Sequence, residues 1–408
     1  LLVENYRSTR NIVDAANNVM AQASSRMKTE AIRVNAARAK SAPGGDWQQR
    51  DPVAQGRVQI LPAGGSPQEQ AQAVYTEVKR MLALGLDPTG TAVIARQWRF
   101  LDPVRAALES AGIPVAMADE EAPPLWRLRE TQALLRHLEN RPAVSRTSLL
   151  KAEEIQAWLS SQNGTGWWPT LEEAIAVFAD DTQGGEVSLA FFRDWLAEWG
   201  RASRRRQTGV LLLTAHRAKG LEFDHVFVLD GEWRAGRGEE LDAVRRLYYV
   251  AMTRARATLT LARMDTGNKI VDALDLRPSL LHRVLTPWLP VPGSMECRYF
   301  LPAPREVDLG FAGRHGTKEP VHQAIARLRV GDALRYVTDE RGARLEDATG
   351  TTVGRLSQYF EPPSGLRCQS VRVRAILTWR KSDSAPEFQA RCRCETWEVV
   401  LPELIFAP

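Results

Sequence analysis

The chain has 408 residues, of which 44% are hydrophobic and 25% are charged, and its formal net charge is +5. This length and balance are typical of a globular protein with two or three domains. No run of about 18 or more apolar residues occurs, so we expect no membrane-spanning helix. The mild excess of Lys and Arg is compatible with a polyanionic partner but does not establish one.

The cysteines are few and all lie in the last third of the chain, at Cys297, Cys368, Cys392 and Cys394. This usage argues against a disulfide scaffold and predicts a reducing compartment, the cytoplasm. Cys392 and Cys394 lack the usual spacing of zinc ligands, so we expect no metal site. The chain opens at Leu1 without an initiator Met, which predicts a fragment of a longer polypeptide.

The first part of the chain alternates between helix and strand patterns. Hydrophobic periodicity predicts helices over residues 11–23, 67–84 and 101–111, and short apolar runs predict strands over 58–61, 91–95 and 113–115. Residues 35–56 are rich in Ala, Gly, Pro and charge and are expected to form an exposed loop. Alternating strands and helices indicate an α/β domain with a parallel sheet.

The middle of the chain, residues 125–207, has a helical pattern without clear strands. Its tryptophans are Trp158, Trp167, Trp168, Trp195 and Trp199. The α/β pattern then resumes, with strands predicted at 210–214, 226–229 and 259–261 and a helix at 241–253. A helical insertion therefore interrupts one α/β domain. The basic run Arg201–Arg206 before the resumed strand is either a solvated linker or a phosphate contact.

The pattern of the tail after residue 286 predicts a small β-rich domain, and a barrel is one form that such a domain takes. Short alternating segments occur at 333–337, 352–356 and 371–377. Arginines alternate here with Trp379 and Trp397. Two interpretations remain open: a nucleic-acid-binding barrel, or core tryptophans with exposed arginines.

No phosphate-binding P-loop of the form G-x-x-x-x-G-K-[ST] exists in the chain. Asp230 ends an apolar strand, as a magnesium-holding acid does, but without a P-loop we favour a buried strand that ends at the sheet edge. Three other stretches stand out together: residues 5–8 (NYRS), 214–223 (TAHRAKGLEF) and 249–256 (YVAMTRAR). Each opens or follows an element of the α/β domain. An Arg at a strand end can neutralise charge on a transferring phosphate.

These three stretches resemble motifs IV, V and VI of the UvrD/Rep superfamily 1 DNA helicases, in the same order. The resemblance continues through residues 92–96 and 108–115 and covers roughly 1–140 and 208–265. It implies an α/β, RecA-like, P-loop-NTPase-type parallel sheet without its own P-loop. We therefore expect three parts. Their bounds are 1–140 with 208–285 for the second RecA-like domain, 141–207 for a shortened helical insertion and 286–408 for the β-rich module.

The resemblance implies roles for single residues around ATP. Arg7 and Arg254 would reach the γ-phosphate as arginine fingers. Tyr6 would stack on the adenine, and Glu222 would accept a hydrogen bond from the ribose. Gly220 would let the backbone approach the nucleotide. The structural alternatives are packing of the Tyr6 ring, ion pairs for the two arginines and a solvated acid at Glu222.

Thr214 and His216 would contact single-stranded DNA, although a satisfied loop histidine is an equally simple interpretation of His216. The implied cofactors are ATP and Mg²⁺, and the magnesium ligands would lie in a P-loop motor domain upstream in the same polypeptide. The Lys-Gly-Leu-Glu form of the second stretch favours the UvrD-like branch, which moves 3′ to 5′. This half alone would not hydrolyse ATP.

Two other functions compete. A catalytically inactive, DNA-binding or scaffolding module would have no need to keep Tyr6, Arg7, Glu222 and Arg254 together. A nuclease is suggested only by Glu77-Val78-Lys79, which fits an E-x-K pattern but lies inside a predicted amphipathic helix.

Overall fold

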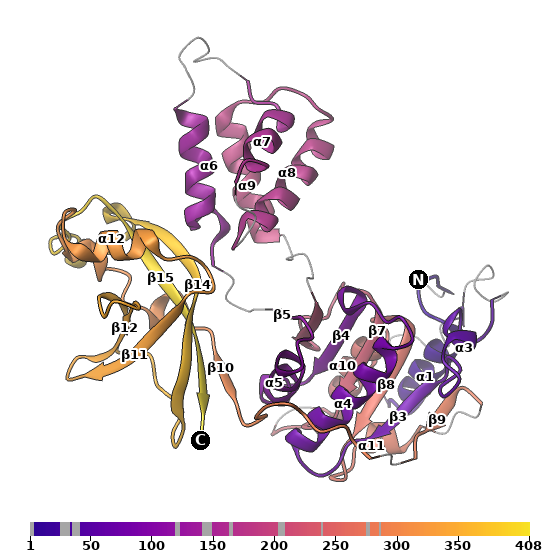
Figure 1. The fold of residues 1–408 in the computed structure, drawn as a ribbon. Helices are drawn as coiled ribbons and strands as arrows, with labels where there is room; N and C mark the ends of the chain where they lie inside the picture. Colours follow the sequence, from indigo (N-terminus) through magenta and orange to yellow (C-terminus); the bar gives the residue numbers. More distant parts are fainter. Residues whose placement is uncertain are drawn as a thin grey trace. The chain divides into compact units, whose positions relative to one another are not determined.

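The computed structural model describes residues 4–24, 33–34, 41–118, 123–140, 149–162, 166–202, 209–237, 240–274, 278–284 and 287–408. The chain forms two compact units (Figure 1). The first comprises Leu1–Asp119 and Gln207–Arg298, and the second comprises Glu120–Arg206 and Tyr299–Pro408. Each unit is therefore built from two separate stretches of the chain.

The first unit is organised around a seven-stranded parallel sheet with the order β5-β6-β4-β7-β8-β3-β9. The strands are β3 (Val58–Pro62), β4 (Thr91–Ala95), β5 (Val115–Met117), β6 (Val210–Thr214), β7 (Phe223–Leu229), β8 (Ala255–Arg263) and β9 (Leu280–His282). All five residues of β4 are buried. A central parallel strand is covered on both faces, which explains its uninterrupted apolar sequence.

Helices cover both faces of this sheet. Helices α1 (Arg10–Ala21) and α10 (Leu241–Met252) pack on one face, and α4 (Pro67–Leu82) and α5 (Asp102–Ser110) pack on the other. Successive side chains of β4 alternate between the two cores, with Ile94 in the first and Val93 in the second. Helix α4 begins at a capping box, in which the Ser66 hydroxyl and the Glu69 carboxylate satisfy each other's backbone N–H groups.

Shorter elements complete the first unit. They are the parallel pair β1 (Glu4–Asn5) and β2 (Arg33–Val34), helices α3 (Trp47–Arg50) and α11 (Lys269–Asp272), and 3₁₀ turns at Pro88–Gly90 and Trp98–Phe100. None of the helices in the described ranges is long and apolar enough to cross a membrane.

The second unit contains a six-stranded sheet with the order β10-β15-β14-β11-β12-β13. Its strands are β10 (Arg298–Phe300), β11 (Ala333–Asp339), β12 (Gly342–Glu346), β13 (Thr352–Arg355), β14 (Arg367–Arg380) and β15 (Thr396–Ala407). Neighbouring strands from β15 to β13 pair antiparallel. The long β14–β15 hairpin forms its centre. Helices α12 (Pro320–Arg327) and α13 (Pro386–Gln389) and three 3₁₀ turns (Pro304–Glu306, Ala312–Arg314 and Lys381–Asp383) accompany it.

The helical stretch of the second unit shares one hydrophobic core with this sheet. After a 3₁₀ turn (Leu125–Arg127), it comprises α6 (Arg129–Glu139), α7 (Ala152–Leu159), α8 (Trp168–Thr182) and α9 (Leu189–Ala202). An isolated bridge joins Leu128 to Leu377 of β14, and the Trp167 indole donates to the carbonyl of Arg374 at 3.1 Å. Helices and sheet therefore stabilise each other across a sequence gap of about two hundred residues.

The expected class, an α/β parallel-sheet domain with a helical stretch and a β-rich module, is confirmed. Among the elements that were not predicted are α3, which lies in the expected loop, and β9, which is only three residues long. The side chains of the basic run Arg201–Arg206 lie outside the described residues.

Candidate functional site

The segment that carries Tyr6 and Arg7 is held as a tight turn ahead of α1. The side-chain oxygen of Asn5 accepts hydrogen bonds from the backbone N–H groups of Arg7 and Ser8, both at 2.8 Å. The Ser8 hydroxyl then donates to the carbonyl of Ala255 at 2.7 Å. These bonds fasten the turn to the amino end of β8, although 247 positions separate Ser8 from Ala255.

The connection between β6 and β7 crosses the sheet from one edge to the other, because the two strands are parallel. The carbonyl of Thr214 accepts from the N–H groups of Arg217 at 2.9 Å and Ala218 at 3.1 Å, which starts the connection as a turn. Ala218 is fully buried against the sheet. Gly220 has a φ of +77°, a left-handed conformation that glycine adopts without a steric penalty. The connection thereby delivers Glu222 to the amino end of β7.

Arg254 joins the end of α10 to this connection. Its guanidinium donates to the carbonyl of Val250 at 3.0 Å and to the carbonyl of Leu221 at 3.1 Å. Its own carbonyl accepts from Phe223 N–H at 2.9 Å, where β7 begins. The half-buried side chain therefore lies beside the amino ends of β7 and β8.

Arg7, Glu222 and Arg254 form one charged cluster at this edge of the sheet. Arg7 and Glu222 make an ion pair, with side chains 33% and 37% exposed. Burial and then the neighbouring charge of Arg7 lower the pKa of Arg254, while Glu222 partly offsets them. The ion pair with the Glu222 carboxylate is made by Arg7, while Arg254 lies close enough to feel the charges of both. The Arg7 Nε is buried and has no hydrogen-bond partner among the described residues. Such a site has surplus positive charge and unused donors for an anion.

Tyr6 lies beside the cluster with its side chain turned to the surface, since the residue is 61% exposed. Its ring is therefore not packed into the α1 core, which was the structural alternative. An exposed aromatic face next to paired arginines can stack on a planar ligand group.

Thr214 and His216 lie elsewhere. They follow the carboxyl end of β6, whereas Arg7, Glu222 and Arg254 lie at the amino ends of β7 and β8, which is the opposite edge of a parallel sheet. His216 is exposed, but Thr214 is only 6% exposed. The structure thus separates the residues expected at the nucleotide from those expected at DNA.

Sequence reasoning missed the residues that hold the cluster in place. The sequence analysis included Asn5 and Ser8 in a motif but gave them no role of their own. An Asn side chain that bonds the backbone two residues further on is a common turn signal, and it could have indicated the role of Asn5. Arg256, two residues after Arg254, lies outside the cluster and pairs with Asp224 at 3.0 Å. Tyr249 is half-buried against Arg254, and burial raises the pKa of its phenol.

The acid that superficially resembles a magnesium ligand is occupied by the protein itself. Asp230 is buried and accepts hydrogen bonds from the backbone N–H groups of Gly231 and Met264 and from the Asn268 amide, at 2.8–3.1 Å. Burial raises its pKa. Within the described ranges, no group of three or more His, Cys, Asp or Glu side chains could hold a metal ion.

The nuclease pattern is likewise structural. Glu77 is 2% exposed and its carboxylate is bound by Arg80 at 2.7 Å and Arg283 at 3.1 Å. In the tail, Trp397 is only 3% exposed and donates to the Leu309 carbonyl at 2.7 Å, so it is a core residue.

The first unit is thus a parallel sheet between two layers of helices, with Arg7, Glu222 and Arg254 together at one edge of the sheet. The sequence model of the UvrD-like helicase C-terminal domain matches residues 1–150 and 195–266, which is more than half of the chain. The chain belongs to the family of UvrD-like helicase C-terminal domains.

Relatives agree with this assignment. The chain is 28% identical over 284 residues to the ATP-dependent DNA helicase UvrD2 of Mycobacterium tuberculosis (strain H37Rv), a match that covers 64% of this chain and 38% of that protein. It is 46% identical over 104 residues to the putative ATP-dependent DNA helicase YjcD of Bacillus subtilis (strain 168), which covers 21% and 14% respectively. The chain thus spans well under half the length of these relatives.

A solved structure, the C-terminal domain of a possible DNA helicase from Lactobacillus plantarum WCFS1, also matches. The match covers 68% of this chain and 98% of that one, with a TM-score of 0.32 and 14% identity.

Proposed function

We propose that this chain is the C-terminal motor half of an ATP-dependent DNA helicase or translocase that moves 3′ to 5′ in the manner of the UvrD-like branch. The observation that carries the proposal is the charged cluster of Arg7, Glu222 and Arg254 at the exposed amino edge of the parallel sheet. A scaffold has no need of two guanidiniums beside a single carboxylate at an exposed edge of the sheet.

The site residues divide the work as follows. Arg7 and Arg254 neutralise negative charge at the phosphate end of ATP, the role of an arginine finger. Tyr6 stacks on the base, Glu222 accepts a hydrogen bond from the ribose, and the turn at Gly220 lets the backbone approach. ATP, held with Mg²⁺ by a P-loop domain upstream in the same polypeptide, supplies the bond that is hydrolysed. Because the fingers and the P-loop stand on different domains, hydrolysis requires the two domains to close.

Single-stranded DNA is the proposed partner at the opposite edge of the sheet, where β6 ends. His216 is the exposed candidate for a phosphate contact. Thr214, being nearly buried, would act through its turn, whose carbonyl bonds position His216. The connection over residues 215–222 would then link the DNA edge of the sheet to the nucleotide edge.

The decisive experiment measures ATP hydrolysis stimulated by single-stranded DNA in the full-length polypeptide. We expect Arg254→Ala to lower the rate by about 1,000-fold or more, the usual effect of losing an arginine finger. Arg256→Ala is the matched control, because Arg256 lies two residues away and pairs with Asp224 outside the cluster. It should retain most of the activity. The 408-residue chain alone should hydrolyse nothing.

Unfolding midpoints of both variants distinguish a lost finger from a damaged fold. A full-length polypeptide that binds DNA but hydrolyses no ATP would overturn the motor and leave the scaffolding alternative.

A further inference from the structure

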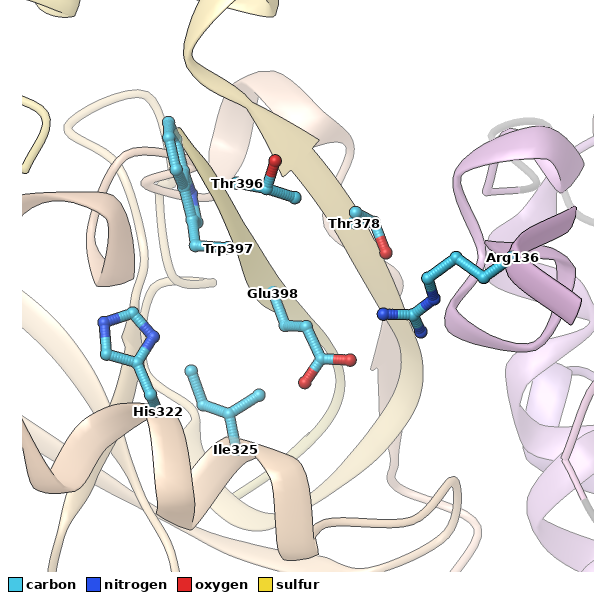
Figure 2. A pocket seen from close by; sticks show the side chains of 7 residues that line it. All are labelled: Arg136, His322, Ile325, Thr378, Thr396, Trp397 and Glu398. Carbon is cyan, nitrogen blue, oxygen red and sulfur yellow. The ribbon is translucent and has the colours of Figure 1, made fainter. Parts of the chain in front are cut away.

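The second unit contains a cavity of about 450 Å³ that the proposed motor does not use. Its wall includes Arg129, Glu130 and Arg136 of α6, Trp168 at the start of α8, Arg329 after α12 and Glu398 of β15. A neighbouring hollow of about 300 Å³ shares Arg136 and Glu398 with it. In Figure 2 the Arg136 guanidinium extends from α6 toward the strands that carry Thr378 and Glu398. Cavities of this size accommodate small ligands or single nucleotides.

The frame of the cavity is tied together by Arg129. Its Nε and Nη2 atoms donate to the Glu398 carboxylate at 2.6 and 2.7 Å. Its remaining donors reach the carbonyls of Leu328 and Ile325, both at 2.7 Å. All of its polar groups are therefore used within the protein, and Arg129 and Glu398 neutralise each other.

Two other guanidiniums give the wall of the cavity a net positive charge. Arg136 and Arg329 are exposed, and within the described part of the chain neither makes an ion pair. Among the described residues, the hydrogen-bond acceptor of the Arg136 side chain is the carbonyl of Gln132, at 3.2 Å. The nearby carboxyl group of Glu130 is 8% exposed, and its Oε2 has no hydrogen-bond partner among the described residues. Burial raises the pKa of Glu130, which weakens its negative charge.

An aromatic side chain stands in the same wall. Trp168 is partly buried and rests edge-on against Trp158, with ring centroids 5.8 Å apart. This support fixes one side of the indole. An aromatic ring beside surplus guanidiniums is the combination that binds single-stranded nucleic acid, since the ring stacks on a base and the cations meet phosphates. An acidic peptide would use the arginines but offers no planar group for the indole.

We propose that this cavity is a second binding site for single-stranded DNA, in which Arg136 and Arg329 contact phosphates and Trp168 stacks on a base. The proposal rests on the proposed function for its choice of ligand. It adds a contact on the helical and β-rich unit, separate from the residues that follow β6.

The test measures binding of a fluorescently labelled 12-nucleotide oligo(dT) to the full-length polypeptide without ATP, over a series of salt concentrations. Each phosphate contact contributes about 0.7 to the slope of log affinity against log salt, so the double variant Arg136→Gln/Arg329→Gln should lose about 1.4 from that slope. The double variant to Lys keeps both charges and should keep the slope. Arg341→Gln, an exposed arginine on the β11–β12 turn, is the matched control.

An unchanged slope in the Arg136→Gln/Arg329→Gln variant would overturn the second site, and an acidic protein partner would then be the better occupant. ATP hydrolysis at saturating DNA separates this result from failure of the motor itself. We expect the variant to reach the same maximal rate as the parent, at a higher DNA concentration. If the maximal rate collapses while the slope is unchanged, the cavity acts on catalysis and the proposed DNA contact is wrong.

Discussion

Arg7 and Arg254 approach one carboxylate from positions far apart in the sequence, and this juxtaposition gives the site its charge. Their recognition depended on motifs that resemble a family. Their geometry depended on side chains such as Asn5, which no periodicity reveals. A residue's type and spacing therefore predicted which side chains matter, but not that Arg7 pairs with Glu222 while Arg254 is shared between backbone carbonyls.

At the residue scale, the buried His225 makes the stability of the first unit depend on pH. The ring is buried on β7, edge-on to Trp47 with centroids 4.6 Å apart, and hydrogen-bonded to the Thr258 hydroxyl at 2.9 Å. Burial lowers its pKa to about 4. The His225 ring therefore binds a proton near pH 6.5 in the unfolded chain but only near pH 4 in the folded chain. The free energy of unfolding consequently falls as the pH falls from 6.5 towards 4.

We expect this residue to remove about 2 kcal/mol from the free energy of unfolding of the first unit between pH 7 and pH 5. His225→Gln should flatten that pH dependence, while the exposed His282→Gln should not. Denaturant titrations at both pH values measure the effect. Equal pH slopes in the parent and His225→Gln would contradict it.

At the scale of elements, the turn over residues 5–8 fixes the positions of Tyr6 and Arg7 ahead of α1. Because the Asn5 side chain satisfies two backbone N–H groups, Asn5→Ala should cost about 1 kcal/mol of stability. It should also slow ATP hydrolysis by the full-length polypeptide, since Arg7 loses its fixed position. Asn5→Asp keeps the acceptor oxygen and should recover most of the activity. An Asn5→Ala variant with full activity would show that the ion pair alone positions Arg7.

Most elements of the α/β unit were predictable, and the exceptions have physical causes. Strand β4 was predicted with its observed bounds, because a strand covered on both faces is a continuous apolar run. Strand β7 begins three residues earlier than expected, at Phe223, because backbone pairing with β8 continues where the apolar pattern stops. Strand β14 is similarly longer than expected, since its two ends pair with β15 but are partly or fully exposed and so lack an apolar pattern.

At the scale of the whole molecule, the two units have separate cores. One cluster of buried side chains belongs entirely to the second unit, and two clusters, one on each face of the parallel sheet, belong to the first. Separate cores favour separate unfolding. We therefore expect two calorimetric transitions for the 408-residue chain.

Only one of these transitions should respond to His225. Lowering the pH from 7 to 5 should lower the unfolding temperature of the first unit more in the parent than in His225→Gln. For the second unit, the shift in unfolding temperature should be the same in both proteins. A single cooperative transition that shifts as a whole would refute the independence of the two cores.

The sequence by itself determined the class of fold, because hydrophobic periodicity is local, and it determined the family, because motif residues are adjacent in the chain. The partition of the chain was decided only by tertiary structure. Helix α6 was expected to belong with the α/β domain, but Arg129 and Leu128 connect its start to β15 and β14, more than two hundred positions away. Such pairings depend on which apolar faces meet in space, and a single sequence does not record them. Tertiary structure likewise decided two further features. It placed Thr214 and Arg254 at opposite edges of the sheet, and it formed the cavity beside Trp168.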